Sequence, residues 1–220
     1  MVNEESVFDV PACGSLAERR LQHQYGTTAR AQAFYRNQML DHLNPAMRQF
    51  LARQEMMFIS TADAEGEADC SFRAGLPGFV RVLDERSLCY PEYRGNGVMA
   101  SLSNIAQTSQ VGLLFVDFMA GKIGLHVNGR ARIAGNSEVI ADPRCTPEIR
   151  TDLQQVGGRR PERWVLVHVQ EAYIHCSKHI PRLRRLAEGE VPWGTDDDTA
   201  KGGDYFGVRA GRRSSQISPA

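Results

Sequence analysis

Short β-prone segments separated by turns fill the chain between Met56 and Cys176, and this pattern limits the possible folds more than any other feature. We expect strands where β-branched and aromatic residues are concentrated between breaks of Gly, Pro, Asp and Ser. These segments are residues 57–62, 68–73, 79–83, 88–90, 111–118, 123–133 and 164–176. Residues 98–107 have helical spacing, and residues 142–162 form a loop with at most a short helix. Because helices do not alternate with strands, the pattern excludes a doubly wound parallel sheet and predicts a mostly antiparallel α+β barrel with one inserted helix.

The first quarter of the chain carries helix signals instead of strand signals. Residues 15–25 are rich in Leu, Ala, Arg and Gln, and Ser15 with Glu18 fits the capping box that begins many helices. A rough apolar stripe predicts a second helix over residues 28–43. Asn44-Pro45 then marks the start of a third helix, with Asn as its cap and Pro at its first position.

The strand pattern ends after Ile180-Pro181, where the chain becomes polar and rich in Gly. Three regions follow: an N-terminal helical segment at residues 1–55 that packs on the barrel, a split β-barrel at residues 56–183, and an extended C-terminal tail at residues 184–220. Trp193, Tyr205 and Phe206 are aromatics that a wholly disordered tail rarely contains. We therefore expect residues 192–207 to pack on the barrel or over the active site of a partner.

The charge balance argues against electrostatic binding of nucleic acid or of an anionic membrane. The chain has 26 Lys plus Arg against 26 Asp plus Glu, a net charge of zero. Its longest apolar runs are only a few residues, against the roughly 20 that a membrane-spanning helix needs. Five cysteines without a C-x-x-C pair, and an N-terminus without a basic region and an apolar run, predict reduced thiols in a cytoplasmic protein.

Three strings, in order and with matching spacing, carry a family resemblance. They are Leu88-Cys89-Tyr90; Arg94-Gly95-Asn96-Gly97-Val98-Met99-Ala100-Ser101-Leu102; and Val111-Gly112-Leu113-Leu114-Phe115 followed by Leu125-His126-Val127-Asn128-Gly129-Arg130-Ala131. Together they resemble the FMN-binding split barrel of the pyridoxamine 5'-phosphate oxidase superfamily. The resemblance implies FMN held across the barrel between two protomers, and hence a homodimer with the flavin at its interface.

The resemblance also implies a set of cofactor-binding residues in this chain. They are Ser71, Phe72, Arg73, Tyr90, Asn96, Gly97, Val98 and Ser101. The first three fall on the strand that contacts the flavin and its phosphate, Tyr90 falls beside the isoalloxazine ring, and the others fall at the start of the inserted helix. A helix N-terminus with free N–H groups suits an anion, and an arginine adds a bidentate phosphate partner.

The chain departs from the vitamin oxidase itself. That enzyme has a Ser-Arg-Lys run at the helix start, where this chain has Met99-Ala100-Ser101, and its C-terminal Arg-x-His motif is not found here. We therefore expect a less specialised member of the superfamily, in which Arg73, Arg81 or Arg94 compensates for the missing cations. For Arg73 two interpretations stay open: a phosphate ligand, or a structural salt bridge that offsets the burial of its charge.

Other residues also keep two interpretations. Asn96-Gly97 fits a tight turn as well as a flavin contact, Ser101 fits a surface helix position, and Tyr90 fits a cross-strand core aromatic. His126 and Asn128 face either a partner protomer or solvent. The run His175-Cys176-Ser177-Lys178-His179 has zinc-ligand spacing only if it is helical, but it follows a strand, so we predict no metal site and place Lys178 and His179 at the surface or in the flavin pocket.

The leading functional hypothesis is an FMN-dependent oxidoreductase. It would move a hydride or electron pair between a nicotinamide or similar donor and a small organic acceptor or oxygen, with the flavin carrying the redox chemistry. The sequence identifies no catalytic acid or base. One alternative is a flavin-binding or flavin-storage module without turnover. Another is a split barrel that uses haem or a deazaflavin coenzyme, and haem would take a histidine ligand such as His126 or His175.

Overall fold

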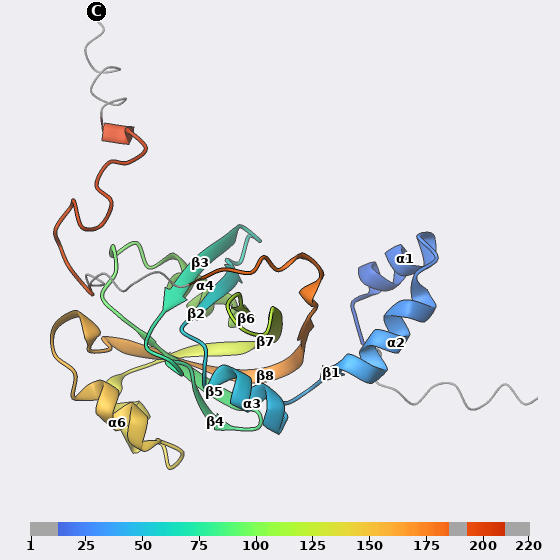
Figure 1. Ribbon diagram of the computed structural model, residues 1–220, viewed down its shortest axis with the longest axis horizontal. Coiled ribbons are helices and arrows are strands. Elements are labelled where there is room, and N and C mark those ends of the chain that lie inside the picture. The colour runs from blue at the N-terminus through green and yellow to red at the C-terminus, as the bar shows by residue number, and fades with distance from the viewer. Residues whose placement is uncertain (1–12, 185–192, 210–220) are drawn as a thin grey trace, which may run out of the picture.

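The computed structural model describes residues 13–184 and 193–209, and a single antiparallel sheet lies at its centre (Figure 1). The sheet curls around a core without closing, which confirms the predicted α+β split barrel. The strands are β1 (Met39–Leu40), β2 (Met56–Ala62), β3 (Ala68–Ala74), β4 (Arg81–Asp84), β5 (Ser87–Glu92), β6 (Gln110–Asp117), β7 (Ile123–Ala134) and β8 (Arg163–His175). All seven predicted strands are present, and β1 is an eighth that the sequence pattern did not reveal.

The sheet joins β1, the first strand of the described chain, to β8, the last one. Neighbouring strands follow the order β3-β2-β6-β7-β8-β5-β4, and β1 pairs with β8 beyond the end of β5. Alternate side chains of each strand point inward, where they form the main core. Fully or nearly fully buried examples are Met57, Ile59, Leu113, Phe115 and Val127.

The longest ladder joins β7 and β8, and a bulge interrupts it. Asn128 pairs with Glu171 whereas Gly129 pairs with Val169, so β8 carries one extra residue at this point. A Cβ atom on Gly129 would lie 2.1 Å from the carbonyl oxygen of His168, a contact that only glycine avoids. Beyond the bulge, arginines on β7 are exposed on the outer face of the sheet.

Helix α4 (Ala100–Thr108) is inserted between β5 and β6 and begins two residues later than predicted. Leu102 and Ile105 pack into the main core, and the buried Asn104 donates a hydrogen bond to Thr61 on β2 (3.1 Å). Val98, which the sequence pattern placed at the start of this helix, precedes it and is 71% exposed. The chain turns at Met99, whose φ of 61° lies in the left-handed region, and helix α4 begins at the next residue. The helix packs against β2 and β3.

Helix α6 (Pro147–Leu153) is the one short helix that the prediction allowed in residues 142–162, whereas α5 (Asn136–Ala141) precedes that segment and was not predicted. They cover the outer face of β5 and β8 and bury Trp164 and Cys89 in a second apolar cluster. The Trp164 ring nitrogen donates to Asn136 (3.1 Å). Short 3₁₀ turns follow at Gly157–Arg159 and, after β8, at Ser177–His179.

The N-terminal helices α1 (Leu16–Gln24) and α2 (Thr28–Gln38) form a pair at one side of the sheet (Figure 1). The predicted capping box is present, because Ser15 Oγ accepts from the Glu18 N–H (3.1 Å) and Glu18 accepts from the Ser15 N–H (2.7 Å). The predicted extension of the second helix to residue 43 is wrong. Helix α2 ends at Gln38 because Met39 and Leu40 pair with β8, and this tertiary pairing overrides the helical spacing.

Asn44 caps α3 (Pro45–Leu51) as predicted, by accepting a hydrogen bond from the Met47 N–H (2.9 Å). Within residues 13–184 and 193–209, no helix is long and apolar enough to cross a membrane. The same residues contain no group of three or more His, Cys, Asp and Glu side chains that could hold a metal ion. All five cysteines are free thiols.

Candidate functional site

A cavity of about 440 Å³ opens where β3, the loop after β5 and the first turn of α4 meet; we call it the α4 cavity. Seven of the eight predicted cofactor-binding residues line it: Ser71, Phe72, Arg73, Asn96, Gly97, Val98 and Ser101. The eighth, Tyr90, does not. The cavity is also lined by residues that the sequence analysis did not single out: Asp69, Glu92, Tyr93, Glu162 and Arg163.

Strand β3 supplies a row of polar groups to the cavity. Asp69, Ser71 and Arg73 are partly buried and share one side of the strand, because alternate residues point the same way. Phe72 also borders the cavity, but its side chain is 53% exposed and its ring packs edge-on against Phe58 on β2 (5.6 Å between centroids). The row therefore presents a carboxylate, a hydroxyl and a guanidinium group toward α4.

The start of α4 offers backbone donors. The first backbone hydrogen bond of the helix runs from the Ser103 N–H to the Met99 carbonyl (2.8 Å), so the preceding N–H groups have no helical partner. No side chain caps this end. Asn96 folds the loop by accepting from the Val98 N–H (3.0 Å), and Gly97 adopts a φ of 80° that side chains disfavour. Asn96-Gly97 is thus a tight turn that opens onto a helix end suited to an anion.

Each arginine that lines the α4 cavity is already in an ion pair. The pairs are Arg73–Glu92 (2.8 Å), Arg94–Asp196 (2.6 Å) and Arg163–Glu162 (3.4 Å). Only the first is largely buried, with side chains 22% and 10% exposed. The salt-bridge interpretation of Arg73 is confirmed, and a phosphate at this guanidinium group would have to share it with Glu92.

A carboxylate lies where β3 meets α4. Asp69 accepts hydrogen bonds from Ser71 Oγ (2.9 Å) and Ser101 Oγ (2.9 Å), and the two hydroxyl oxygens are 3.2 Å apart. Ser101 is 3% exposed, so these contacts fasten the first turn of α4 to β3. The surface interpretation of Ser101 is wrong. Each serine has a single O–H, which Asp69 already accepts, so an anion at this helix end would compete with Asp69 for both donors and would meet its negative charge.

Two tyrosines near the end of β5 have different roles. Tyr90 is fully buried in the main core, as its core-aromatic interpretation required, and its hydroxyl has no hydrogen-bond partner among the described residues. Burial raises the pKa of Tyr90 well above its usual range. Tyr93 lines the α4 cavity instead, and burial raises the pKa of its phenol to about 12. The aromatic in the wall is therefore three residues further along the chain than predicted.

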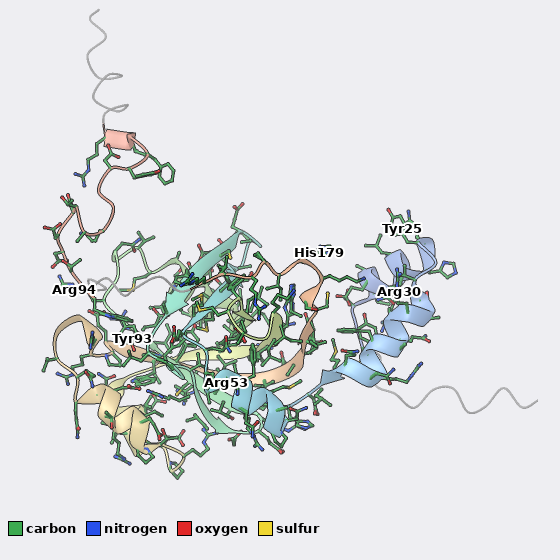
Figure 2. The ribbon with its side chains drawn as sticks, viewed as in Figure 1. Tyr25, Arg30, Arg53, Tyr93, Arg94 and His179 are labelled. Atoms are coloured by element: carbon green, nitrogen blue, oxygen red, sulfur yellow. The ribbon has the colours of Figure 1, made fainter. Side chains whose placement is uncertain are left out.

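The C-terminal segment contacts the rim of the α4 cavity at Tyr93 and Arg94, which Figure 2 labels. Trp193 packs edge-on against Tyr93 (5.3 Å between centroids), and Asp196 binds Arg94. This confirms the predicted packing of the tail on the barrel at Trp193, while residue 192 lies outside the described residues. Tyr205 and Phe206 contact each other and are 86% and 89% exposed, so the prediction is wrong for them.

The other singled-out residues lie away from this cavity. His126 stacks on Tyr173 (4.7 Å between centroids), and its Nε2 lies 2.9 Å from Nδ1 of His175. Burial and the neighbouring His175 lower the pKa of His126 below its usual range. Asn128 donates to Glu171 on β8 (3.0 Å). The contact of this face with a partner stays a prediction.

Arg81, Lys178 and His179 also lie outside the α4 cavity. Arg81 does not line the α4 cavity, because it forms a two-pronged ion pair with Asp152 on α6 (2.8 Å). It therefore does not compensate for missing cations there. Lys178 and His179 are exposed, in agreement with the surface interpretation (His179 is labelled in Figure 2).

Comparison with known proteins points to one family. The family model for pyridoxamine 5'-phosphate oxidase matches residues 43–176. No curated protein matches the chain. Among solved structures, the chain is similar to HupZ of Group A Streptococcus, with 18% identity and a TM-score of 0.44 over 64% of this chain and 99% of HupZ.

Two further solved structures show the same kind of likeness. The heme storage protein HutZ from Vibrio cholerae is 14% identical, with a TM-score of 0.39 over 60% of this chain and 93% of HutZ. An F420 reductase is 13% identical, with a TM-score of 0.38 over 58% of this chain and 94% of the reductase. At such identities the likeness concerns the fold alone.

Proposed function

Because the chain belongs to the pyridoxamine 5'-phosphate oxidase family, we propose that it is an FMN-binding oxidoreductase. In this proposal it moves a hydride or electron pair between a nicotinamide or similar donor and a small organic acceptor or oxygen. FMN binds in the α4 cavity, and a second copy of the chain completes the site.

The donor set of the α4 cavity carries this proposal. Backbone N–H groups at the start of α4 and the guanidinium group of Arg73 are donors that suit a phosphate monoester. The single O–H of Ser71 and that of Ser101 are donated to Asp69, and each would turn from Asp69 to the phosphate when a ligand binds. Cβ atoms built on Gly95 and Gly97 meet nothing within 4 Å, so backbone lies open to a ligand there. The volume of about 440 Å³ falls in the usual range of small-molecule sites, roughly 300–1,000 Å³.

When bound, the flavin supplies the redox chemistry. The side chains of this protein position it and limit access of water. Arg73 is held in one orientation by Glu92, so little side-chain entropy is lost when it contacts a phosphate. Tyr93 is protonated near neutral pH, as an ordinary tyrosine is, and burial raises its pKa further, so its O–H serves as a hydrogen-bond donor. Trp193 covers the Tyr93 ring at the rim.

The first experiment is an absorbance spectrum of the purified protein, followed by chromatography of whatever heat denaturation releases. Flavin bands, released intact as FMN, support the proposal, whereas a colourless protein that also fails to bind added FMN contradicts it. Ser101→Ala removes a hydroxyl from the cavity and should weaken FMN binding by roughly tenfold. Ser103→Ala, on the exposed side of the same helix, is the matched control and should leave binding unchanged.

The outer face of the sheet supports the proposed homodimer. Residues that pair directly from one strand to the next form a row across six strands: Phe72, Phe58, Leu114, His126, Tyr173 and Met39. Phe72 and Phe58 are 53% and 37% exposed. Helices α1 and α2 bury no residue, and Tyr25, labelled in Figure 2, is exposed. A second copy fits this surface because a self-complementary apolar face makes an isologous dimer.

Light scattering at micromolar concentration tests the dimer. Phe58→Asp places a charge in the middle of the apolar row and should convert a dimer to monomers. Leu76→Asp changes an exposed leucine in the turn after β3 and should leave the dimer intact. A monomeric wild-type protein would contradict the proposal that a second copy of the chain completes the site. It would not bear on whether one chain binds FMN, which the absorbance spectrum measures.

Turnover separates an enzyme from a flavin-storage module. Rapid reduction of the bound flavin by NADH or NADPH, followed by reoxidation with a small organic acceptor or oxygen, supports an oxidoreductase. Tight FMN binding without reduction supports the storage module. One observation favours haem as a second candidate ligand, namely the adjacent rings of His126 and His175 on the outer face. A Soret band in place of flavin bands would favour it.

A further inference from the structure

A second cavity of about 440 Å³ lies over β7, β8 and β5, beyond the bulge at Gly129; we call it the arginine cleft. Its charged and ionisable lining residues are Arg130, Arg132, Arg144 and His168, with no Asp or Glu among them. Leu83 and Leu166 supply apolar surface to the same cleft. None of these residues borders the α4 cavity.

Arg130 and His168 have side chains without a partner among the described residues. Arg130 on β7 pairs directly with His168 on β8, and its other cross-strand neighbour, Gln110 on β6, is uncharged. Neither Arg130 nor His168 makes a side-chain hydrogen bond or an ion pair with any residue in the described part of the chain. Arg132 follows two residues later on the same face, so positive charge collects along β7.

Arg144 enters the cleft in a fixed orientation. It donates to Asp142 through two nitrogens, to Asp84 (2.7 Å) and to Ser87 (3.0 Å). These contacts engage four of its N–H groups and leave the fifth for a ligand. Arg132 is likewise oriented by Glu138. The cleft therefore combines two oriented guanidinium groups with a third that no carboxylate neutralises.

We infer that the arginine cleft binds a small phosphate monoester. Planar guanidinium groups match phosphate oxygens in a bidentate way, and Arg130 has all of its donors available for one. His168 lies directly opposite and adds a ring N–H, while the organic part of the ligand packs on Leu83 and Leu166. The volume suits a nucleotide-sized ligand. The inference is independent of whether FMN binds in the α4 cavity.

Calorimetric titration of the full-length protein with AMP tests the inference, after saturation with FMN if FMN binds. AMP should bind at one site per chain, and adenosine, which lacks the phosphate, should not bind. Arg130→Ala and His168→Ala should each weaken AMP binding by roughly tenfold. Arg163→Ala, at the α4 cavity, is the matched control and should leave the AMP affinity unchanged.

Several outcomes would overturn the inference. Absence of saturable AMP binding would do so, as would an Arg130→Ala variant that binds AMP as tightly as the wild type while its circular dichroism is unchanged. Equal affinity for inorganic phosphate would remove the role of the organic part. Tight binding of single-stranded RNA without AMP binding would assign the cleft to a polyanion instead.

Discussion

Two cavities of equal volume balance their charge in different ways. In the α4 cavity each lining arginine has a carboxylate partner, and Asp69 adds negative charge at the helix end. In the arginine cleft Arg132 and Arg144 also have carboxylate partners, but Arg130 has no partner among the described residues. An arginine that is paired with a carboxylate of the protein, such as Arg73, needs no ligand to neutralise its charge, but an anionic ligand must replace or share that carboxylate when it binds. An unpaired cation binds an anion directly and contributes little to folding.

The same residue type therefore has two roles in one molecule. Arg73 on β3 is largely buried, and its charge requires Glu92 on β5 to offset desolvation. Arg130 lies on an exposed sheet face, where water solvates it. An arginine beside a cavity is therefore available to an anionic ligand only to the extent that carboxylates of the protein leave its N–H groups unpaired.

Arg73→Ala gives the largest expected effect and sharpens the comparison directly. It leaves Glu92 as a nearly buried carboxylate without its partner, so the free energy of unfolding should fall by roughly 3 kcal/mol. Arg130→Ala, the matched change in the arginine cleft, should alter it by less than about 0.5 kcal/mol. Urea unfolding measures both. Adding Glu92→Gln to the Arg73 variant should restore part of the loss, and equal effects of the two single changes would break the comparison.

Asp69→Asn should strengthen FMN binding, on the order of tenfold. The amide oxygen can still accept from Ser71 and Ser101, but the negative charge beside the start of α4 is removed. Flavin fluorescence titration measures the change. Glu65→Gln, in the exposed turn between β2 and β3, makes the same change in net charge and should have no effect. A weaker FMN complex in the Asp69 variant would mean that the phosphate does not lie at this helix end.

Strand positions and helix caps could be predicted from the sequence because they depend on local chemistry. The capping box at Ser15 and the cap at Asn44 need only neighbouring atoms, and both are present. β1 could not be predicted, because Met39 is a strand residue only by virtue of its pairing with Tyr173, far along the chain. The end of α2 was missed for the same reason.

The candidate site could be predicted only as far as the strand and loop that hold it. The family resemblance implied that Arg73 and Gly97 belong to one site, and both line the α4 cavity. The pattern cannot show that Glu92, 19 residues away, neutralises Arg73, because β3 and β5 are not neighbouring strands and only the curl of the sheet brings these two residues together. It also cannot distinguish Tyr90 from Tyr93, because this requires knowing which side of β5 faces the core.

Acidification tests the effect of protonating the histidine pair on the outer face of the sheet, where His126 contacts His175. Burial and His175 lower the pKa of His126 in the folded state. The unfolded chain takes up a proton at the ordinary pKa, near 6.5, before the folded chain does. The free energy of unfolding should therefore fall as pH decreases through that value to the folded-state pKa. His126→Gln should flatten this part of the profile in urea unfolding at several pH values; an unchanged slope would contradict the assignment.

Asp196→Asn gives the smallest expected effect and tests whether the tail competes with a ligand for Arg94. This ion pair is exposed, so its loss should change the free energy of unfolding by less than about 1 kcal/mol. The freed guanidinium group should then raise FMN affinity roughly twofold at low salt, and less at high salt because ions screen it. Asp197→Asn alters the neighbouring residue, whose side chain accepts from the Ala200 N–H, and should leave FMN affinity unchanged. If Asp196→Asn instead weakened FMN binding, the tail would be holding the rim of the α4 cavity in the geometry that binds FMN. The Arg94–Asp196 ion pair would then shape the cavity, and Asp196 would not compete with the ligand for Arg94.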